Sequence, residues 1–141
     1  MYVGCQGFGT SRHELQFMVR HGVTHMDTSI DPDNLDLLRQ GREEAAAEGV
    51  ELEMIHIPIA ESITLAQDPQ RDRDIDAICG WIENVGKAGL RGLNYNFSVV
   101  GYQRTAARYG RGGSQFSSFE FAKYDNDAPH KGGQVDRDEI F

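Results

Sequence analysis

The sequence lacks the features of a secreted, membrane-spanning or nucleic-acid-binding protein. Its two cysteines, Cys5 and Cys79, are too few for a framework of disulfide bonds, so we expect both to be reduced thiols. No apolar run approaches the roughly 18 residues of a membrane span, and no signal-peptide pattern opens the chain. The net charge of -8 at pH 7 has the wrong sign for nucleic acid or an anionic membrane. These absences favour a cytoplasmic protein whose partner is a small molecule or another protein.

What the sequence does contain is a repeated junction between helix and strand. Three times a single glycine stands between a helical pattern and an apolar run, at Gly22, Gly49 and Gly89. Glycine suits the position after a helix, where φ is positive and a side chain is unfavourable. The pattern predicts four strands, near residues 2–7, 23–28, 51–57 and 91–97, with helices between them. In a chain of 141 residues this order predicts an α/β domain with a parallel sheet.

Capping signals predict where the three helices begin. Ser11 and Glu14 form a capping box, and Asn34 is a suitable cap for the second helix. Asp68-Pro69 has the order of an N-cap and a first helical residue. In the third helix, helical spacing predicts one apolar stripe of Ile75, Ile78, Cys79, Ile82 and Val85. We therefore expect the Cys79 side chain to lie in the core.

The regular pattern ends after Val100. The segment 101–134 is rich in Gly, Ser and Asn and has no sustained period, so we expect an irregular loop with a functional role. The last residues, "QVDRDEIF" at 134–141, have the acid-rich start of a further helix. Four strands and the beginning of a fourth helix correspond to half of a larger repeating fold.

Three motifs give this chain a family resemblance. Tyr95-Asn96-Phe97 is followed by Arg104-Thr105, the third expected strand ends in "HIPIAESI" at 56–63, and "GRGGSQFSSFEF" follows at 110–121. In this order and spacing the motifs resemble the mannonate dehydratase family, sugar-acid lyases of the xylose-isomerase-like superfamily. The resemblance implies a (β/α)8 TIM barrel. This chain would supply the first four β/α units of it, because a whole barrel needs about 250 residues.

The resemblance also implies an activity and a cofactor. The family dehydrates D-mannonate to 2-keto-3-deoxy-D-gluconate, a step of glucuronate catabolism, with the help of a divalent metal (Mn or Fe). Its metal ligands are His, Cys and Asp residues on later strands, beyond Phe141, so we expect none in this chain. The catalytic acid and base groups also belong to later strands. We therefore expect the chain alone to be inactive and to provide part of the substrate pocket.

The candidate substrate-binding residues follow from the active-site position in TIM barrels, at the C-terminal ends of the strands. Five residues stand near such ends: Gln6, Asp27, His56, Asn94 and Asn96. The two asparagines are two residues apart, so a strand would direct both to one face, where amides can bind sugar hydroxyls. Arg104 matches the family's Arg-Thr pair, and its guanidinium could hold the substrate carboxylate. Each of these side chains could instead have no ligand and only form hydrogen bonds with neighbouring protein groups or solvent.

Two other functions fit the same residues. One is a sugar isomerase or epimerase of the same superfamily, which would use the pocket with different metal ligands. The other is a half-barrel that binds a sugar acid without turnover or that self-associates. Four parallel strands leave two open edges, and two copies could close a barrel as a homo-oligomer.

Overall fold

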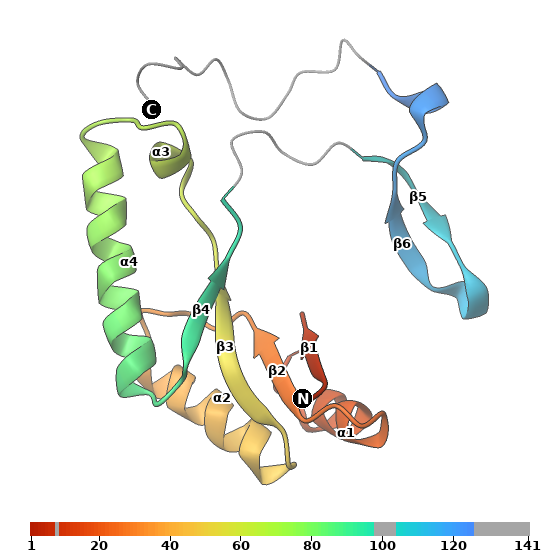
Figure 1. Ribbon diagram of the computed structural model, residues 1–141, viewed down its shortest axis with the longest axis horizontal. Coiled ribbons are helices and arrows are strands. Elements are labelled where there is room, and N and C mark those ends of the chain that lie inside the picture. Colours follow the sequence, from red (N-terminus) through yellow and green to blue (C-terminus); the bar gives the residue numbers. More distant parts are fainter. Residues whose placement is uncertain (8, 98–103, 126–141) are drawn as a thin grey trace. The chain divides into compact units, whose positions relative to one another are not determined.

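The computed structural model describes residues 1–7, 9–97 and 104–125, which belong to two compact units, Met1–Phe97 and Ser98–Phe141 (Figure 1). The first unit alternates strands with helices: β1 (Gly4–Gln6), α1 (Arg12–Arg20), β2 (His25–Thr28), α2 (Leu35–Ala47), β3 (Glu51–Ile57), α3 (Glu61–Thr64), α4 (Gln70–Lys87) and β4 (Gly92–Tyr95). The short α3 was not expected from the sequence. The four strands lie within the four predicted ranges.

The strands of the first unit form one parallel sheet in the order β1-β2-β3-β4. Gln6 lies opposite Asp27, and His56 lies opposite Asn94. The register between β2 and β3 shifts at Met26 and Asp27. The predicted parallel β-α-β order is thereby confirmed, and the C-terminal ends of all four strands lie at the same edge of the sheet.

The three glycine junctions share one hydrogen-bonding pattern. After α1, the N–H of Gly22 bonds to Val19 O and that of the next residue to Met18 O. Corresponding pairs of bonds end α2 at Gly49 and α4 at Gly89, and all three glycines have φ between 76° and 84°. This is the Schellman motif, which needs a left-handed residue after the helix. The predicted glycine caps are confirmed, and each reverses the chain into the following strand.

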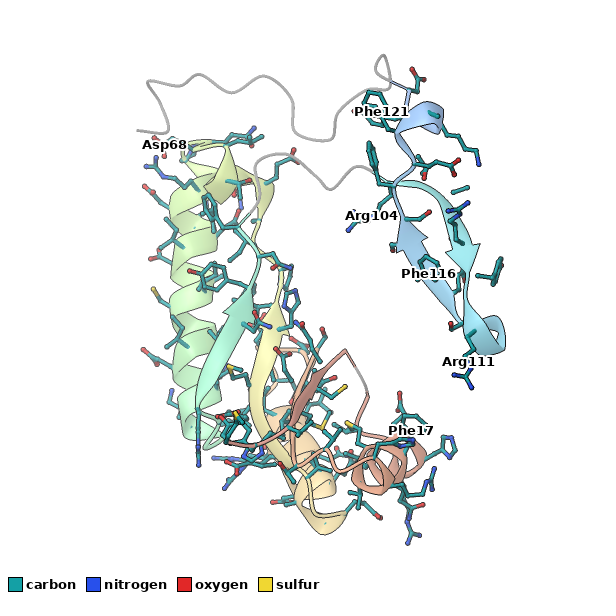
Figure 2. All side chains as sticks on the ribbon, turned by 45° about the vertical axis from the view of Figure 1, so that its right-hand side comes forward. Phe17, Asp68, Arg104, Arg111, Phe116 and Phe121 are labelled. Carbon is teal, nitrogen blue, oxygen red and sulfur yellow. The ribbon has the colours of Figure 1, made fainter. Side chains whose placement is uncertain are left out.

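Two of the three predicted helix starts are confirmed. The Ser11 hydroxyl accepts a hydrogen bond from Glu14 N, and the Asn34 side chain accepts one from Leu37 N at 3.1 Å. The third prediction is wrong, because α4 begins at Gln70 and Pro69 takes the N-cap position. Asp68, labelled in Figure 2, forms an ion pair with Arg71 at 2.7 Å instead. The Asp68-Pro69 peptide is cis.

The core lies between the sheet and its helices. One cluster joins Leu15 and Met18 of α1, Leu38 and Ala45 of α2, and Val85 of α4 to outward side chains of β2 and β3, namely Met26, Leu52, Ile55 and Ile57. The helices therefore cover one face of the sheet, as Figure 1 shows for α2 and α4. Burial of these aliphatic side chains stabilises the fold by roughly 1.5–3 kcal/mol each.

The expected core position of Cys79 is wrong. Cys79 is exposed, whereas Val85 on the same helix is buried and Ile78 is partly buried against the core. Adjacent helical residues are 100° apart, so when Ile78 faces the sheet Cys79 points beside it. The apolar stripe of α4 is thus wider than the surface that β3 and β4 cover.

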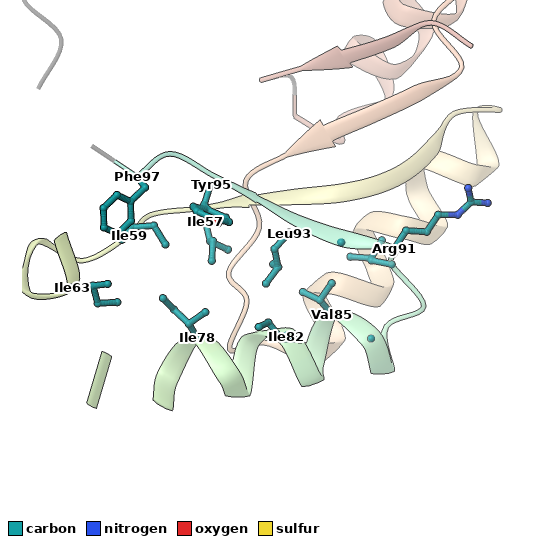
Figure 3. A pocket seen from close by; sticks show the side chains of 13 residues that line it. Ile57, Ile59, Ile63, Ile78, Ile82, Val85, Arg91, Leu93, Tyr95 and Phe97 are labelled. Atoms are coloured by element: carbon teal, nitrogen blue, oxygen red, sulfur yellow. The ribbon is translucent and has the colours of Figure 1, made fainter. Parts of the chain in front are cut away.

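The uncovered part of that stripe borders an apolar groove between α4 and β4. Figure 3 shows its side chains directed toward one another from the helix, the strand and the segment after β3. The groove has a volume of about 620 Å³ and is lined mainly by Ile57, Ile59, Ile63, Ile78, Ile82, Leu93, Tyr95 and Phe97. Ile82, Tyr95 and Phe97 are more than half exposed. Among the described strands β4 pairs only with β3, so β4, which contributes Leu93 and Tyr95 to the groove, is an edge strand.

The described part of the second unit is a β-hairpin with a short helical turn at each end of its second strand. Strand β5 (Thr105–Tyr109) pairs antiparallel with β6 (Gln115–Ser118). The short 3-10 helix η1 (Arg111–Gly113) connects the two strands, and a second one, η2 (Phe121–Lys123), follows β6. Figure 2 shows Arg111 at the hairpin tip and Phe116 on β6. The expectation that 101–134 is irregular is therefore wrong for the hairpin. The fourth helix expected at 134–141 lies outside the described residues.

The glycine caps generate a test with an internal control. Gly49→Ala places a methyl group in open space but at φ +84°, so we expect the free energy of unfolding to fall by about 1–2 kcal/mol. Gly80→Ala, also with open space around its new methyl, lies inside α4 and should stabilise by about 0.5–1 kcal/mol. Urea unfolding of the purified chain measures both changes. If both substitutions changed the free energy of unfolding in the same direction, the assignment of Gly49 as a left-handed cap would be contradicted.

Candidate functional site

The face of the sheet opposite the helices carries polar side chains. Along β2 the buried Met26 faces the core, and its neighbours His25 and Asp27 alternate to the other face. On β4, Leu93 packs against the core and Asn94 alternates with it. A parallel sheet is usually covered on both faces, and in a barrel the second face is the enclosed interior. The polar face is therefore where a barrel would form its interior and its pocket.

One hydrogen bond crosses the middle of this face. Asn94 Nδ2 on β4 donates to Asp27 Oδ2 on β2, although β3 lies between these strands. Adjacent strands are about 4.8 Å apart, so in a flat sheet the two backbones would be separated by roughly 9.5 Å. Two short side chains bridge this separation more readily when the sheet curves toward them. The contact thus indicates that the polar face is concave.

Asp27 is buried and only partly satisfied. It is 6% exposed, its Oδ2 accepts from Asn94, and its Oδ1 has no hydrogen-bond partner among the described residues. His56 Nδ1, on the neighbouring strand, is likewise buried without a partner in the described part of the chain. An unsatisfied buried polar group costs about 1–3 kcal/mol, so such groups commonly mark a place where a further partner binds.

A pocket of about 350 Å³ lies against Asp27 and Asn94. Its lining includes Gln6, Asp27 and Asn94, three of the residues predicted from the sequence, together with Tyr2, Cys5, His25, Glu53 and Met54. Cys5 is half-buried beside these groups. The pocket combines one buried carboxylate, two amides and an aromatic hydroxyl, a set that suits a hydroxyl-bearing ligand.

The part of this pocket nearest the N-terminal ends of the strands carries polar groups that were not predicted. The Tyr2 hydroxyl donates to Glu53 with 2.8 Å to Oε1, and the Tyr2 ring stacks on His25 with ring centroids 3.7 Å apart. Arg91 pairs with Glu51 at 3.1 Å. The hydrogen bond to Glu53 raises the pKa of Tyr2 above its ordinary value, because it stabilises the protonated phenol. The only signal in the sequence was the alternation of Glu51, Leu52 and Glu53, which a solvent-facing strand shares.

The remaining predicted residues have different positions. His56 is at the C-terminal end of β3 and pairs in register with Asn94, but it does not line the pocket. Asn96 follows the end of β4 and is exposed. Arg104 belongs to the second unit, where it precedes β5 and is exposed. The binding roles of all six residues stay predictions.

Neither a metal centre nor a membrane segment is found in the described residues. Within 1–7, 9–97 and 104–125, no group of three His, Cys, Asp or Glu side chains is placed to hold a metal ion. None of the helices described is long and apolar enough to cross a membrane.

Two comparisons with known proteins relate this geometry to an enzyme family. The model of the family described as D-mannonate dehydratase (UxuA) matches residues 22–134. The crystal structure of mannonate dehydratase from Streptococcus suis serotype 2 is similar with a TM-score of 0.71 and 22% sequence identity. That match covers 91% of this chain and 40% of the other, so this chain spans less than half of the solved protein. The structural match shows a shared TIM-barrel-like α/β fold, of which the parallel sheet and its helices are a part.

The matched family segment contains most of the polar face. It runs from residue 22, just before β2, to residue 134 in the second unit, and so includes Asp27, His56, Asn94, Asn96 and Arg104. Gln6 and the first strand lie outside it but within the same sheet. Since the family model covers well over half of the 141 residues, this chain belongs to the D-mannonate dehydratase family.

Proposed function

We propose that this chain contributes the hydroxyl-binding part of a sugar-acid dehydratase site, with D-mannonate as substrate and 2-keto-3-deoxy-D-gluconate as product. The observation that carries the proposal is the Asp27–Asn94 pair. It joins two parallel strands on the polar face and leaves a buried carboxylate oxygen free to accept a hydrogen bond from a ligand. Membership of the family supports the reaction class.

The reaction removes a proton next to the substrate carboxylate and expels the neighbouring hydroxyl group. The divalent metal that the family resemblance implies (Mn or Fe) would stabilise the developing negative charge. The described residues do not offer a ligand set for this metal. Their contribution is to bind and orient the sugar chain, which fixes the reacting atoms relative to catalytic groups.

Arg104 is our candidate for the substrate carboxylate. A guanidinium presents two parallel N–H donors to a carboxylate, and the resulting pair is stronger than a neutral hydrogen bond. Its neighbour Thr105 bonds through its hydroxyl to Ser118 O at 3.3 Å and accepts from Glu120 N at 3.1 Å. These bonds hold the backbone at the start of β5, beside the arginine.

A second candidate function is binding of a sugar acid without turnover. The Asp27–Asn94 pair and its pocket would serve such binding equally well, because hydrogen bonds to sugar hydroxyls need no metal ion. An isomerase or epimerase reaction would use the same polar face and no observation here favours it over dehydration. Cytoplasmic location and homo-oligomerisation stay predictions.

The first functional test is an activity assay of the purified chain. With D-mannonate and added Mn²⁺, we expect no formation of 2-keto-3-deoxy-D-gluconate near the rate of a full-length relative, because the elimination loses several kcal/mol of charge stabilisation without a bound metal. Product is measured over time with and without the metal. Robust metal-dependent turnover would contradict this expectation and would make Asp27 and His56 the first ligand candidates.

The second functional test concerns Arg104. If its guanidinium holds the carboxylate, Arg104→Ala should weaken D-mannonate binding about ten- to a hundredfold, the equivalent of roughly 1.5–3 kcal/mol. Arg104→Lys should restore only part of it, because an ammonium lacks the planar pair of donors. Calorimetric titration measures the affinity, and circular dichroism checks the fold.

Arg111→Ala is the matched control, since Arg111 is an exposed residue at the hairpin tip. We expect little change in affinity from it. Equal, small effects of the two alanine variants would mean that the carboxylate is held elsewhere and that Arg104 is an ordinary surface charge.

A further inference from the structure

The pocket beside Asp27 and Asn94 carries several hydrogen-bond acceptors. The Asn94 amide has two N–H donors and one acceptor oxygen, and Asp27 Oδ2 accepts a hydrogen bond from its Nδ2. The amide is thereby fixed in one orientation, with its Oδ1 left to accept a hydrogen bond. Asp27 is in this sense a positioning residue for Asn94.

The carboxylates of the pocket add to this acceptor character. Asp27 Oδ1 is buried and without a partner in the described part of the chain, and an ionised carboxylate can only accept. Glu53, which also lines the pocket, already accepts a hydrogen bond from the Tyr2 hydroxyl. A ligand that satisfies Asp27 Oδ1 must therefore bring a donor, as the hydroxyl groups of a sugar chain do.

The same charges act against one end of a sugar acid. The carboxylate of such a ligand has no donor to offer, and in this pocket it would lie near both Asp27 and Glu53. Like charges repel, and the burial of Asp27 weakens the screening of its charge by solvent. A sugar acid thus gains hydrogen bonds when its polyol end enters the pocket and is repelled when its carboxylate end enters.

We propose that the pocket lined by Gln6, Asp27 and Asn94 binds the polyol end of the sugar acid and excludes its carboxylate. The proposal rests on the proposed function and deepens it, because it assigns the direction in which the substrate lies. Asp27 is the residue that determines this direction, through its free oxygen and through the orientation it gives to Asn94.

Ligand titrations of the unmodified chain test the direction without any variant. Three probes are compared by the shifts of backbone amide signals in ¹H–¹⁵N spectra: D-mannonate, the neutral polyol D-mannitol, and acetate as a carboxylate without a sugar chain. We expect mannonate and mannitol to move the signals of Gln6, Asp27 and Asn94, and acetate to leave them in place. Shifts of these signals by acetate, and none by mannitol, would overturn the proposal.

Asp27→Asn tests the role of the charge. The substitution keeps the shape and an acceptor for Asn94 but removes the ionised oxygen, so we expect affinity for mannonate and for mannitol to fall together by about tenfold. Asp76→Asn, the same chemical change at an exposed position of α4, is the matched control and should change neither affinity. Circular dichroism checks that both variants fold.

The outcomes separate this inference from the function on which it rests. If mannonate binds and Asp27→Asn leaves its affinity unchanged or raises it, the direction is wrong and the proposed function stands. If mannonate and mannitol both fail to shift any signal at concentrations far above those of ordinary substrates, the proposed function fails and the inference fails with it.

Discussion

The hydrogen bond from Asn94 to Asp27 is the interaction on which the arrangement of the polar face depends. It ties β4 to β2 over β3 and so holds three strands in a curve, with helices on the convex side. Curvature brings strand ends that are separate in a flat sheet to one concave surface. The second oxygen of the same carboxylate is buried and has no hydrogen-bond partner among the described residues. Our proposal assigns that oxygen to a ligand, so that one side chain would serve both structure and binding.

Local signals in the sequence predicted the parts of the fold that local interactions determine. The Schellman motifs at Gly22, Gly49 and Gly89 and the caps at Ser11 and Asn34 depend on residues within one helical turn, and the sequence shows them all. Whether Cys79 is buried depends instead on how far β3 and β4 extend beneath α4. The helical spacing of apolar residues carries no information about that extent. The cis peptide before Pro69 and the hairpin of β5 and β6 were missed because their signals, a proline and a glycine-rich run, fit several conformations.

The residues of the candidate site could be predicted from the sequence only where the ends of the strands could be predicted. Gln6, Asp27 and Asn94 were chosen because they stand near the ends of expected parallel strands, and the structure places them on one pocket. That Asp27 and Asn94 bond to each other could not be read from a sequence, because they are 67 residues apart and on strands that are not neighbours. Tyr2 and Glu53 were missed because a carboxylate on an inner face and one on a solvent-facing strand give the same alternation.

The groove between α4 and β4 has a consequence for the colloidal behaviour of the protein. Apolar side chains next to an unpaired strand edge favour addition of another strand, including one from an unrelated chain. The net charge of -8 opposes such contacts, since copies of the chain repel one another over a distance of about 10 Å at moderate ionic strength. Added salt shortens that distance while leaving the apolar attraction intact. The protection of this edge by the net charge is therefore greatest at low ionic strength and weakens as salt is added.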